Sequence, residues 1–210
     1  MPKIIIDFDY TLFDADKFKD ALYKAVEPFM IEKSRKSWDQ SKDEIQYKLA
    51  FYDYKEHLKK IVDKENLKEA EKAIEKVIQK SDKFLYNDAL DFFKKYKKYE
   101  IYIVSFGVDG FQKNKIKATG LDKKAKVIIT RGEKVKHFKK IIKGTPRQKR
   151  GSAMAEESAV FIDDKGSEID MIKEEYPQVV CYWMRRPKGK FINSPCEKFD
   201  HKINNLKIKL

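Results

Sequence analysis

The chain contains few of the residues that mark several common classes of protein. Its two cysteines, Cys181 and Cys196, have neither metal-ligand spacing nor the pattern of a disulfide framework, so we expect free thiols. No run of about 18 apolar residues is present, and Met-Pro-Lys leads directly into an apolar segment without a signal-peptide pattern. We therefore expect a soluble, cytoplasmic protein with no membrane partner.

Arginine is also scarce, although the 210 residues carry a net charge of +13: only six of the 47 basic residues are arginine. A clustered basic surface would indicate nucleic-acid binding, because it displaces the counterions of phosphate. Here the lysines are spread among acidic residues, as on solvated helix faces. A compositional lysine bias is favoured, and nucleic acid is retained as a disfavoured partner on the basic loops TPRQKRG (145–151) and MRRPKGK (184–190).

Hydrophobic periodicity divides the chain into strand-like and helix-like segments. Residues 3–6, KIII, are few and β-branched, which predicts a buried strand. Residues 14–81 follow helical spacing and predict a helical insertion. Strand-like and helix-like segments then alternate, which is the pattern of a parallel sheet covered by helices. The further strands are expected at 101–105, 125–130, 158–164 and 179–184, with a basic loop at 143–151 and an irregular tail from Pro187.

Polar residues stand at the ends of the predicted strands. Asp7 and Asp9 follow the first strand, Ser105 ends the second, and Asp163 and Asp164 end the fourth. Because ligands of open α/β sheets bind beyond the carboxyl ends of strands, we expect these side chains at one edge. Crowded carboxylates repel each other, and a divalent cation relieves the conflict. Mg²⁺ prefers oxygen ligands and commonly bridges to phosphate, so the pattern indicates a phosphate-handling site.

The exits of the third and fifth strands carry basic residues. Lys134 is favoured as the lysine of the site, because it stands at the start of a helix beside the carboxyl edge of the sheet; Lys136 is the alternative. Arg131 and Arg185 follow these two strands and are candidates for binding a distal anion through bidentate contacts. An ordinary surface position is the alternative for each arginine.

Three of these segments resemble motifs of the haloacid dehalogenase (HAD) superfamily of phosphohydrolases. DFDYT (7–11) is similar to its DxDx[T/V] motif, IYIVS (101–105) to its second motif, and VFIDD (160–164) to its acidic motif, in family order. Tyr10 replaces the glycine that the family most often has. The resemblance implies a Rossmann-like three-layer α/β/α fold with a parallel five-stranded sheet. Residues 1–13 and 82–210 would form the catalytic core domain, and residues 14–81 an inserted α-helical cap.

The resemblance also implies the roles of the aspartates. Asp7 would be the nucleophile and a Mg²⁺ ligand. Asp9 would be the general acid and base, with its backbone carbonyl on the metal. Asp164 would be a metal ligand, and Asp163 would be either a ligand or a residue that contacts the ligands instead of the metal.

Two further residues would complete the reaction that the resemblance implies. Ser105 would hydrogen-bond the transferring phosphoryl group, and Lys134 would neutralise charge. The expected function is a Mg²⁺-dependent phosphatase that hydrolyses a small phosphomonoester through an aspartyl-phosphate. Dehalogenation is disfavoured, because it needs neither Asp9 nor Mg²⁺. A phosphatase of nucleic-acid ends, or a non-catalytic nucleic-acid or protein-binding module on the same fold, stays as the alternative; the substrate and the oligomeric state are left open.

Overall fold

The computed structural model describes residues 2–142 and 159–210, and its strands form one parallel sheet. The expected basic loop at 143–151 and residue 158 of the expected fourth strand lie outside the described residues. The strand order is β3-β2-β1-β4-β5-β6. The strands are β1 (Lys3–Ile6), β2 (Glu100–Phe106), β3 (Lys126–Thr130), β4 (Ala159–Asp163), β5 (Val180–Met184) and β6 (His201–Ile203).

The sheet has one strand more than the five expected. The expectation of an irregular tail was wrong for residues 201–203, which pair in parallel with Tyr182–Met184 of β5. A three-residue edge strand in which His201 and Lys202 are exposed carries too little periodicity to be recognised in a sequence.

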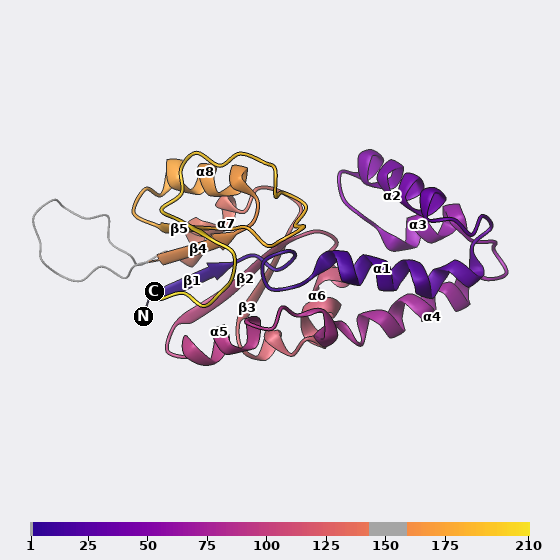
Figure 1. The fold of residues 1–210 in the computed structure, drawn as a ribbon, viewed down its shortest axis with the longest axis horizontal. Helices are drawn as coiled ribbons and strands as arrows, with labels where there is room; N and C mark the ends of the chain where they lie inside the picture. The colour runs from indigo at the N-terminus through magenta and orange to yellow at the C-terminus, as the bar shows by residue number, and fades with distance from the viewer. Residues whose placement is uncertain (1, 143–158) are drawn as a thin grey trace, which may run out of the picture.

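Helices cover both faces of the sheet (Figure 1). The covering helices are α5 (Ala89–Lys95), α6 (Asp109–Ala118), α7 (Val135–Ile141) and α8 (Gly166–Glu175). α5 and α6 lie on one face, and α7 and α8 on the other. Ile4 and Ile6 of β1 belong to the core cluster on the first face, whereas Ile5 belongs to the cluster on the second. Because alternate residues of a strand point to opposite faces, β1 is buried on both sides, and the predicted three-layer α/β/α architecture is confirmed.

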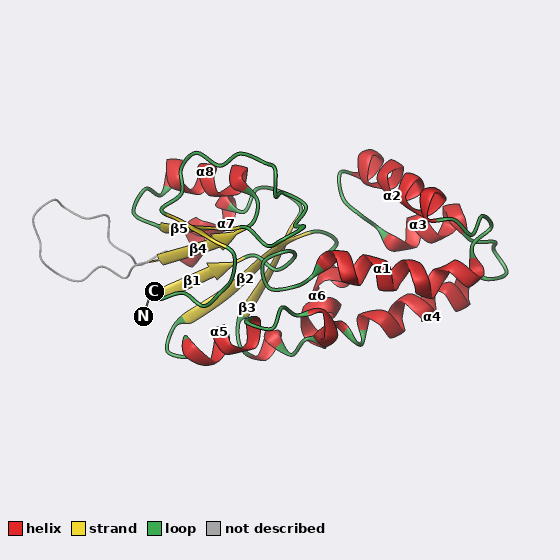
Figure 2. Cartoon of the chain, in the orientation of Figure 1, coloured by secondary structure: helices red, strands yellow, loops and turns green. Residues whose placement is uncertain are grey.

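Five α-helices stand between β1 and β2 in the chain, and we call the segment that carries the first four of them the helical insertion. These four are α1 (Ala15–Val26), α2 (Arg35–Leu49), α3 (Tyr54–Ile61) and α4 (Leu67–Ile78). The short 3₁₀ helix η1 (Glu27–Phe29) follows α1, η2 (Ser81–Phe84) follows α4, and η3 (Leu121–Lys123) lies later in the chain. Figure 2 shows the insertion beyond the ends toward which the strand arrows point. Within the described part of the chain, no helix has both the length and the apolar character of a membrane span.

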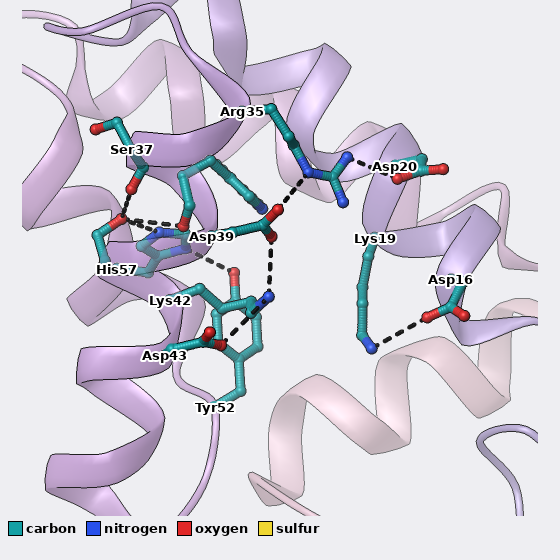
Figure 3. A network of polar contacts seen from close by, with 12 residues as sticks. Asp16, Lys19, Asp20, Arg35, Ser37, Asp39, Lys42, Asp43, Tyr52 and His57 are labelled. Atoms are coloured by element: carbon teal, nitrogen blue, oxygen red, sulfur yellow. Dashed lines mark hydrogen bonds and ion pairs between the residues drawn. The ribbon is translucent and has the colours of Figure 1, made fainter. Parts of the chain in front are cut away.

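Three helices of the insertion, α1, α2 and α3, begin at capping side chains, and a polar network joins α1 to α2 (Figure 3). Asp14 caps α1 by accepting a hydrogen bond from the backbone N–H of Lys17, and Asp53 caps α3 in the same way. Arg35 of α2 lies 2.6 Å from a carboxylate oxygen of Asp20 in α1. These contacts tie the helices together without a disulfide, while the predicted limits of the insertion at residues 14 and 81 stay a prediction.

Candidate active site

The sheet topology brings three acidic side chains together where β1 and β4 lie side by side. Ile6 of β1 aligns with Ile162 of β4, and the backbone N–H of Asp7 donates to the Ile162 carbonyl at 2.9 Å. Asp7 therefore lies beside Asp163, and Asp164 follows directly. One carboxylate oxygen of each aspartate lies within 4.8 Å of the other two, and all three residues are buried. The cluster occupies the switch point of the strand order, where ligands of open α/β sheets bind.

Lys134 pairs with two of these three carboxylates. Its Nζ contacts Asp7 Oδ1 and lies 2.6 Å from Asp163 Oδ2. The residue directly precedes α7, and its backbone N–H donates to Glu168 Oε2 at 3.0 Å. The other oxygen of Asp163 accepts a hydrogen bond from the backbone N–H of Lys165 at 2.8 Å. One ammonium group facing three carboxylates leaves the cluster negatively charged when all three are ionised.

Lys136, the alternative lysine, lies elsewhere. Its side chain is exposed and its Nζ pairs with Glu133 at 3.1 Å on the surface. Of the two lysines, Lys134 is the one that the fold places among the carboxylates.

The shared environment shifts the pKa values of the cluster. Burial raises the pKa of the Asp7 carboxyl to about 7; Lys134 opposes this shift and Asp163 adds to it. Burial also raises the pKa of Asp164, and the neighbouring Asp7 and Asp163 add to the shift. Burial alone would lower the pKa of Lys134, but the Asp163 and Asp7 carboxylates outweigh it and raise that pKa above its ordinary value.

The donor set of the cluster suits a hard divalent cation. Asp164 Oδ2 is buried and has no hydrogen-bond partner among the described residues. A buried carboxylate oxygen without a partner is costly, and two further carboxylates lie beside it. Oxygen ligands of this kind are those that Mg²⁺ prefers, so Asp7, Asp163 and Asp164 fit the ion.

The carboxylate of Asp9 is held outside this cluster, by α6. Gln112 Nε2 donates to Asp9 Oδ2 at 2.8 Å, and Lys115 Nζ lies 2.7 Å from Asp9 Oδ1. The expectation that the backbone carbonyl of Asp9 contacts the metal stays a prediction. Gln112 and Lys115 were missed in the sequence, although positions 112, 115, 116 and 119 have the spacing of a buried helix face.

Ser105 lies at the same edge of the sheet. It stands two residues beyond Ile103, which aligns with Ile6 of β1, and it is buried. The second motif therefore ends beside the loop that carries Asp9.

The two candidate arginines contact other groups. The exposed Arg131 lies over the ring of Phe51 in the helical insertion, at 4.5 Å from the centroid. Arg185 lies over Trp183 at 4.0 Å and donates to the Ser194 carbonyl at 3.3 Å. No contact of either guanidinium with the aspartate cluster occurs within the part of the chain described, so an anion-binding role stays a proposal.

Tyr10 gives the turn between Asp9 and α1 an unusual backbone. Its φ is 62°, in the left-handed region that glycine adopts most readily. The ring is buried, and its hydroxyl donates to Asp16 Oδ1 at 2.6 Å. Burial and this hydrogen bond offset the strain, and the turn keeps its left-handed residue without glycine.

Arg186, which was not identified from the sequence, contacts the loop that follows Asp9. Its guanidinium contacts both carboxylate oxygens of Asp88, at 2.8 and 2.6 Å, and also donates twice to the Thr11 carbonyl, at 3.2 and 3.0 Å. Paired contacts of this geometry are among the stronger charge-assisted hydrogen bonds. They fix the loop that follows Asp9.

Known structures share this fold over nearly the whole chain. No protein-family model matches the chain, and no curated protein matches its sequence. A protein of Burkholderia xenovorans described as a haloacid dehalogenase-like hydrolase gives a TM-score of 0.72 at 16% identity, covering 97% of this chain and 94% of that one. The HAD-hydrolase YfnB of Bacillus subtilis, bound to magnesium, gives 0.59 at 15% identity, covering 98% and 95%.

The L-2-haloacid dehalogenase of Xanthobacter autotrophicus is also similar, with a TM-score of 0.59 at 14% identity over 98% of this chain and 96% of that one. At such identities the similarity establishes the fold. The chain has the fold of the haloacid dehalogenase-like hydrolases, as its motifs imply.

Proposed function

We propose that the chain is a Mg²⁺-dependent phosphatase that hydrolyses a small phosphomonoester through an aspartyl-phosphate on Asp7. The observation that carries the proposal is the buried cluster of Asp7, Asp163 and Asp164 around Lys134, at the ends of adjacent parallel strands. Magnesium bound to the Bacillus subtilis protein of the same fold supports the choice of ion.

The residues provide the steps of such a reaction. Ionised Asp7 attacks phosphorus, the bond from phosphorus to the ester oxygen breaks, and this oxygen leaves with a proton from Asp9. Water then attacks the aspartyl-phosphate and gives its proton to Asp9, which releases phosphate and restores Asp7. Ser105 hydrogen-bonds a phosphoryl oxygen, and Lys134 neutralises charge beside Asp7. Bound Mg²⁺ supplies further neutralisation of the phosphate and carboxylate charges.

Phosphate release from p-nitrophenyl phosphate, with and without Mg²⁺, tests the proposal. The Asp7→Asn variant removes the nucleophile and is expected to lose at least about 10³-fold in kcat. Asp63→Asn, at an exposed position of the insertion, is the matched control and should retain wild-type activity. Unchanged turnover by the Asp7→Asn protein would refute the assignment.

Dehalogenation is the second candidate, because a dehalogenase shares the fold. That reaction uses an aspartate nucleophile but needs no second acid and base, so the firmly held Asp9 favours phosphoryl chemistry. Chloride release from L-2-chloropropionate by the same protein preparation separates the two activities. Chloride without phosphate release would assign the dehalogenase activity instead.

The substrate in this proposal is a small phosphorylated molecule, with Arg131 and Arg185 as candidate contacts to a distal anion. Action on nucleic-acid ends, or binding without catalysis, rests on the net charge of +13 and on basic segments, of which 145–151 lies outside the described residues. Phosphate release from oligonucleotide ends at two salt concentrations tests the first alternative. Titration with an oligonucleotide at the same two concentrations tests the second, since binding through phosphates weakens steeply with salt.

A further inference from the structure

Two buried polar residues of α6 form hydrogen bonds with the carboxylate of Asp9, one to each oxygen. Gln112 is 4% exposed, and its Nε2 donates to Asp9 Oδ2 and to the Phe106 carbonyl, both at 2.8 Å. Lys115 is 3% exposed, and its Nζ lies 2.7 Å from Asp9 Oδ1. The rotamer of Asp9 is therefore set by groups on a single rigid helix.

The surroundings of Lys115 give its ammonium group one acidic partner. Nζ lies 4.9 to 5.4 Å from four ring centroids, those of Phe8, Phe13, Phe18 and Phe111. Ring faces attract a cation at this distance but provide no carboxylate. Among the described residues, Asp9 is the acid that pairs with Lys115. Because a buried charge without a counterion is strongly unfavourable, rotation of Asp9 away from Lys115 is opposed.

The orientation of Gln112 is determined as firmly. Both groups near its Nε2 are acceptors, so a flipped amide would place Oε1 against two oxygens. Gln112 Oε1 is buried and has no hydrogen-bond partner in the part of the chain that the structure describes. This orientation therefore leaves one acceptor unsatisfied while the amide nitrogen donates to Asp9. A Cβ on Gly107, whose φ is 145°, would lie 2.9 Å from Gln112 Cγ, so glycine leaves the space that Gln112 uses.

We propose that Lys115 and Gln112 are positioning residues that fix the Asp9 carboxylate for its exchange of a proton with the leaving group. The inference rests on the proposed phosphatase function and extends it to α6, which none of the three motifs includes. Neither side chain belongs to the Asp7, Asp163 and Asp164 cluster, and both act on the reaction through Asp9.

Dependence on the leaving group separates this role from a general structural one. Glycerol 2-phosphate releases an alkoxide, which needs a proton, whereas p-nitrophenolate leaves readily without one. Lys115→Met keeps an unbranched side chain of similar length, and a thioether packs well among aromatic rings. We expect this variant to lose about 10²-fold in kcat with glycerol 2-phosphate and less than about 10-fold with p-nitrophenyl phosphate, with little change in KM.

Matched variants on the same helix complete the experiment. Lys117→Met makes the same exchange at an exposed position of α6 and should leave both rates unchanged. Gln112→Leu should show the same preference for the good leaving group, with a smaller loss. In an Asp9→Asn background, Lys115→Met should cause no further loss of kcat, because its effect acts through Asp9.

Equal losses with the two substrates, or an undiminished effect in the Asp9→Asn background, would overturn the inference while leaving the phosphatase proposal intact. A wild-type protein that releases phosphate from neither substrate would overturn both. Thermal unfolding midpoints of all variants show whether each protein is folded. If Lys115→Met fails to fold, the Gln112→Leu variant with the two substrates decides the question alone.

Discussion

His57 makes the stability of the helical insertion depend on pH in a way that the contacts define. The ring is fully buried, with Nε2 at 2.8 Å from Ser41 Oγ and Nδ1 at 3.0 Å from the Tyr52 hydroxyl (Figure 3). The Ser41 hydroxyl has the Ser37 and Trp38 carbonyls as acceptors, at 2.7 and 3.1 Å, so its oxygen accepts a hydrogen bond from Nε2–H of His57. Nδ1 is then the acceptor for Tyr52. The neutral ring is satisfied, and a second proton would displace a hydrogen bond.

The size of the effect follows from the shifted pKa. Burial lowers the pKa of His57 from 6.5 to about 4, with the Trp38 carbonyl, Asp39 and Asp43 opposing the shift and Lys42 adding to it. As the pH falls through 6.5, His57 becomes protonated in the unfolded chain, whereas in the folded chain it stays neutral until about pH 4. The unfolded state is thereby favoured, and stability falls with the pH. Between about pH 7 and about pH 4.5 the loss of unfolding free energy is about 2 kcal/mol, since one pKa unit is worth about 1.4 kcal/mol.

Urea unfolding at the two pH values measures this loss. The ring of Trp38 lies 4.4 Å from that of His57, so the fluorescence of Trp38 reports on the insertion. Removing the second tryptophan by Trp183→Phe leaves Trp38 as the sole tryptophan. His57→Gln removes the titrating ring, while all other groups titrate as before.

The difference between the two proteins isolates His57. The protein with His57 should lose about 2 kcal/mol more than the His57→Gln protein over this pH range. Equal losses in the two proteins would show that His57 titrates normally in the folded chain, and the reasoning from its burial and neutral partners would be wrong.

Two further predictions concern the packing around Gly166 and the binding of Mg²⁺. Gly166→Ala should destabilise the protein by about 1 to 3 kcal/mol, because a Cβ there would lie 2.1 Å from the Pro195 carbonyl oxygen. The control is Gly132→Ala, where a Cβ meets open space, and it should change stability by less than about 1 kcal/mol. Chemical denaturation measures both. Equal effects of these two exchanges would contradict the packing argument. Mg²⁺ should raise the thermal midpoint more at pH 8 than at pH 6, because the Asp7 carboxyl, with its pKa raised to about 7, must be ionised to bind the ion. The same increase at both pH values, measured by scanning calorimetry, would contradict the expectation that Asp7 binds the ion and has a raised pKa.

The sheet and its acidic cluster were predictable because their signals are local. An apolar segment such as residues 3–6 marks a buried strand, and parallel strands end at one edge, so acids after β1 and β4 converge. Adjacent pairing of β1 and β4 is decided by the topology, which no short segment encodes.

The helical insertion shows where periodicity misleads. The spacing of Tyr47, Phe51 and Tyr54 predicts one buried face, yet Tyr47 is 93% exposed. Ala50 adopts a left-handed φ of 61° and ends α2, so α3 begins afresh at Tyr54. The apolar spacing therefore continues across the boundary between two separate helices, and it does not predict which of these aromatic residues are buried.

The residues that hold Asp9 were not predictable for a different reason. Lys115 is one of many lysines, and its burial depends on phenylalanines from the loop after β1, from α1 and from α6 itself. Arg186 likewise contacts Thr11 and Asp88, which are 175 and 98 residues away in the chain. Contacts of such separation follow from the assembled fold and not from local pattern.

The central place of β1 also sets the order in which the chain can assemble during synthesis. β1 is synthesised before both of its neighbours, Glu100–Ile103 and Ala159–Ile162. The contacts of α1 with α4 close much sooner, within the insertion. A nascent chain can thus gain helical structure in the insertion before β1 pairs with its second neighbour, β4.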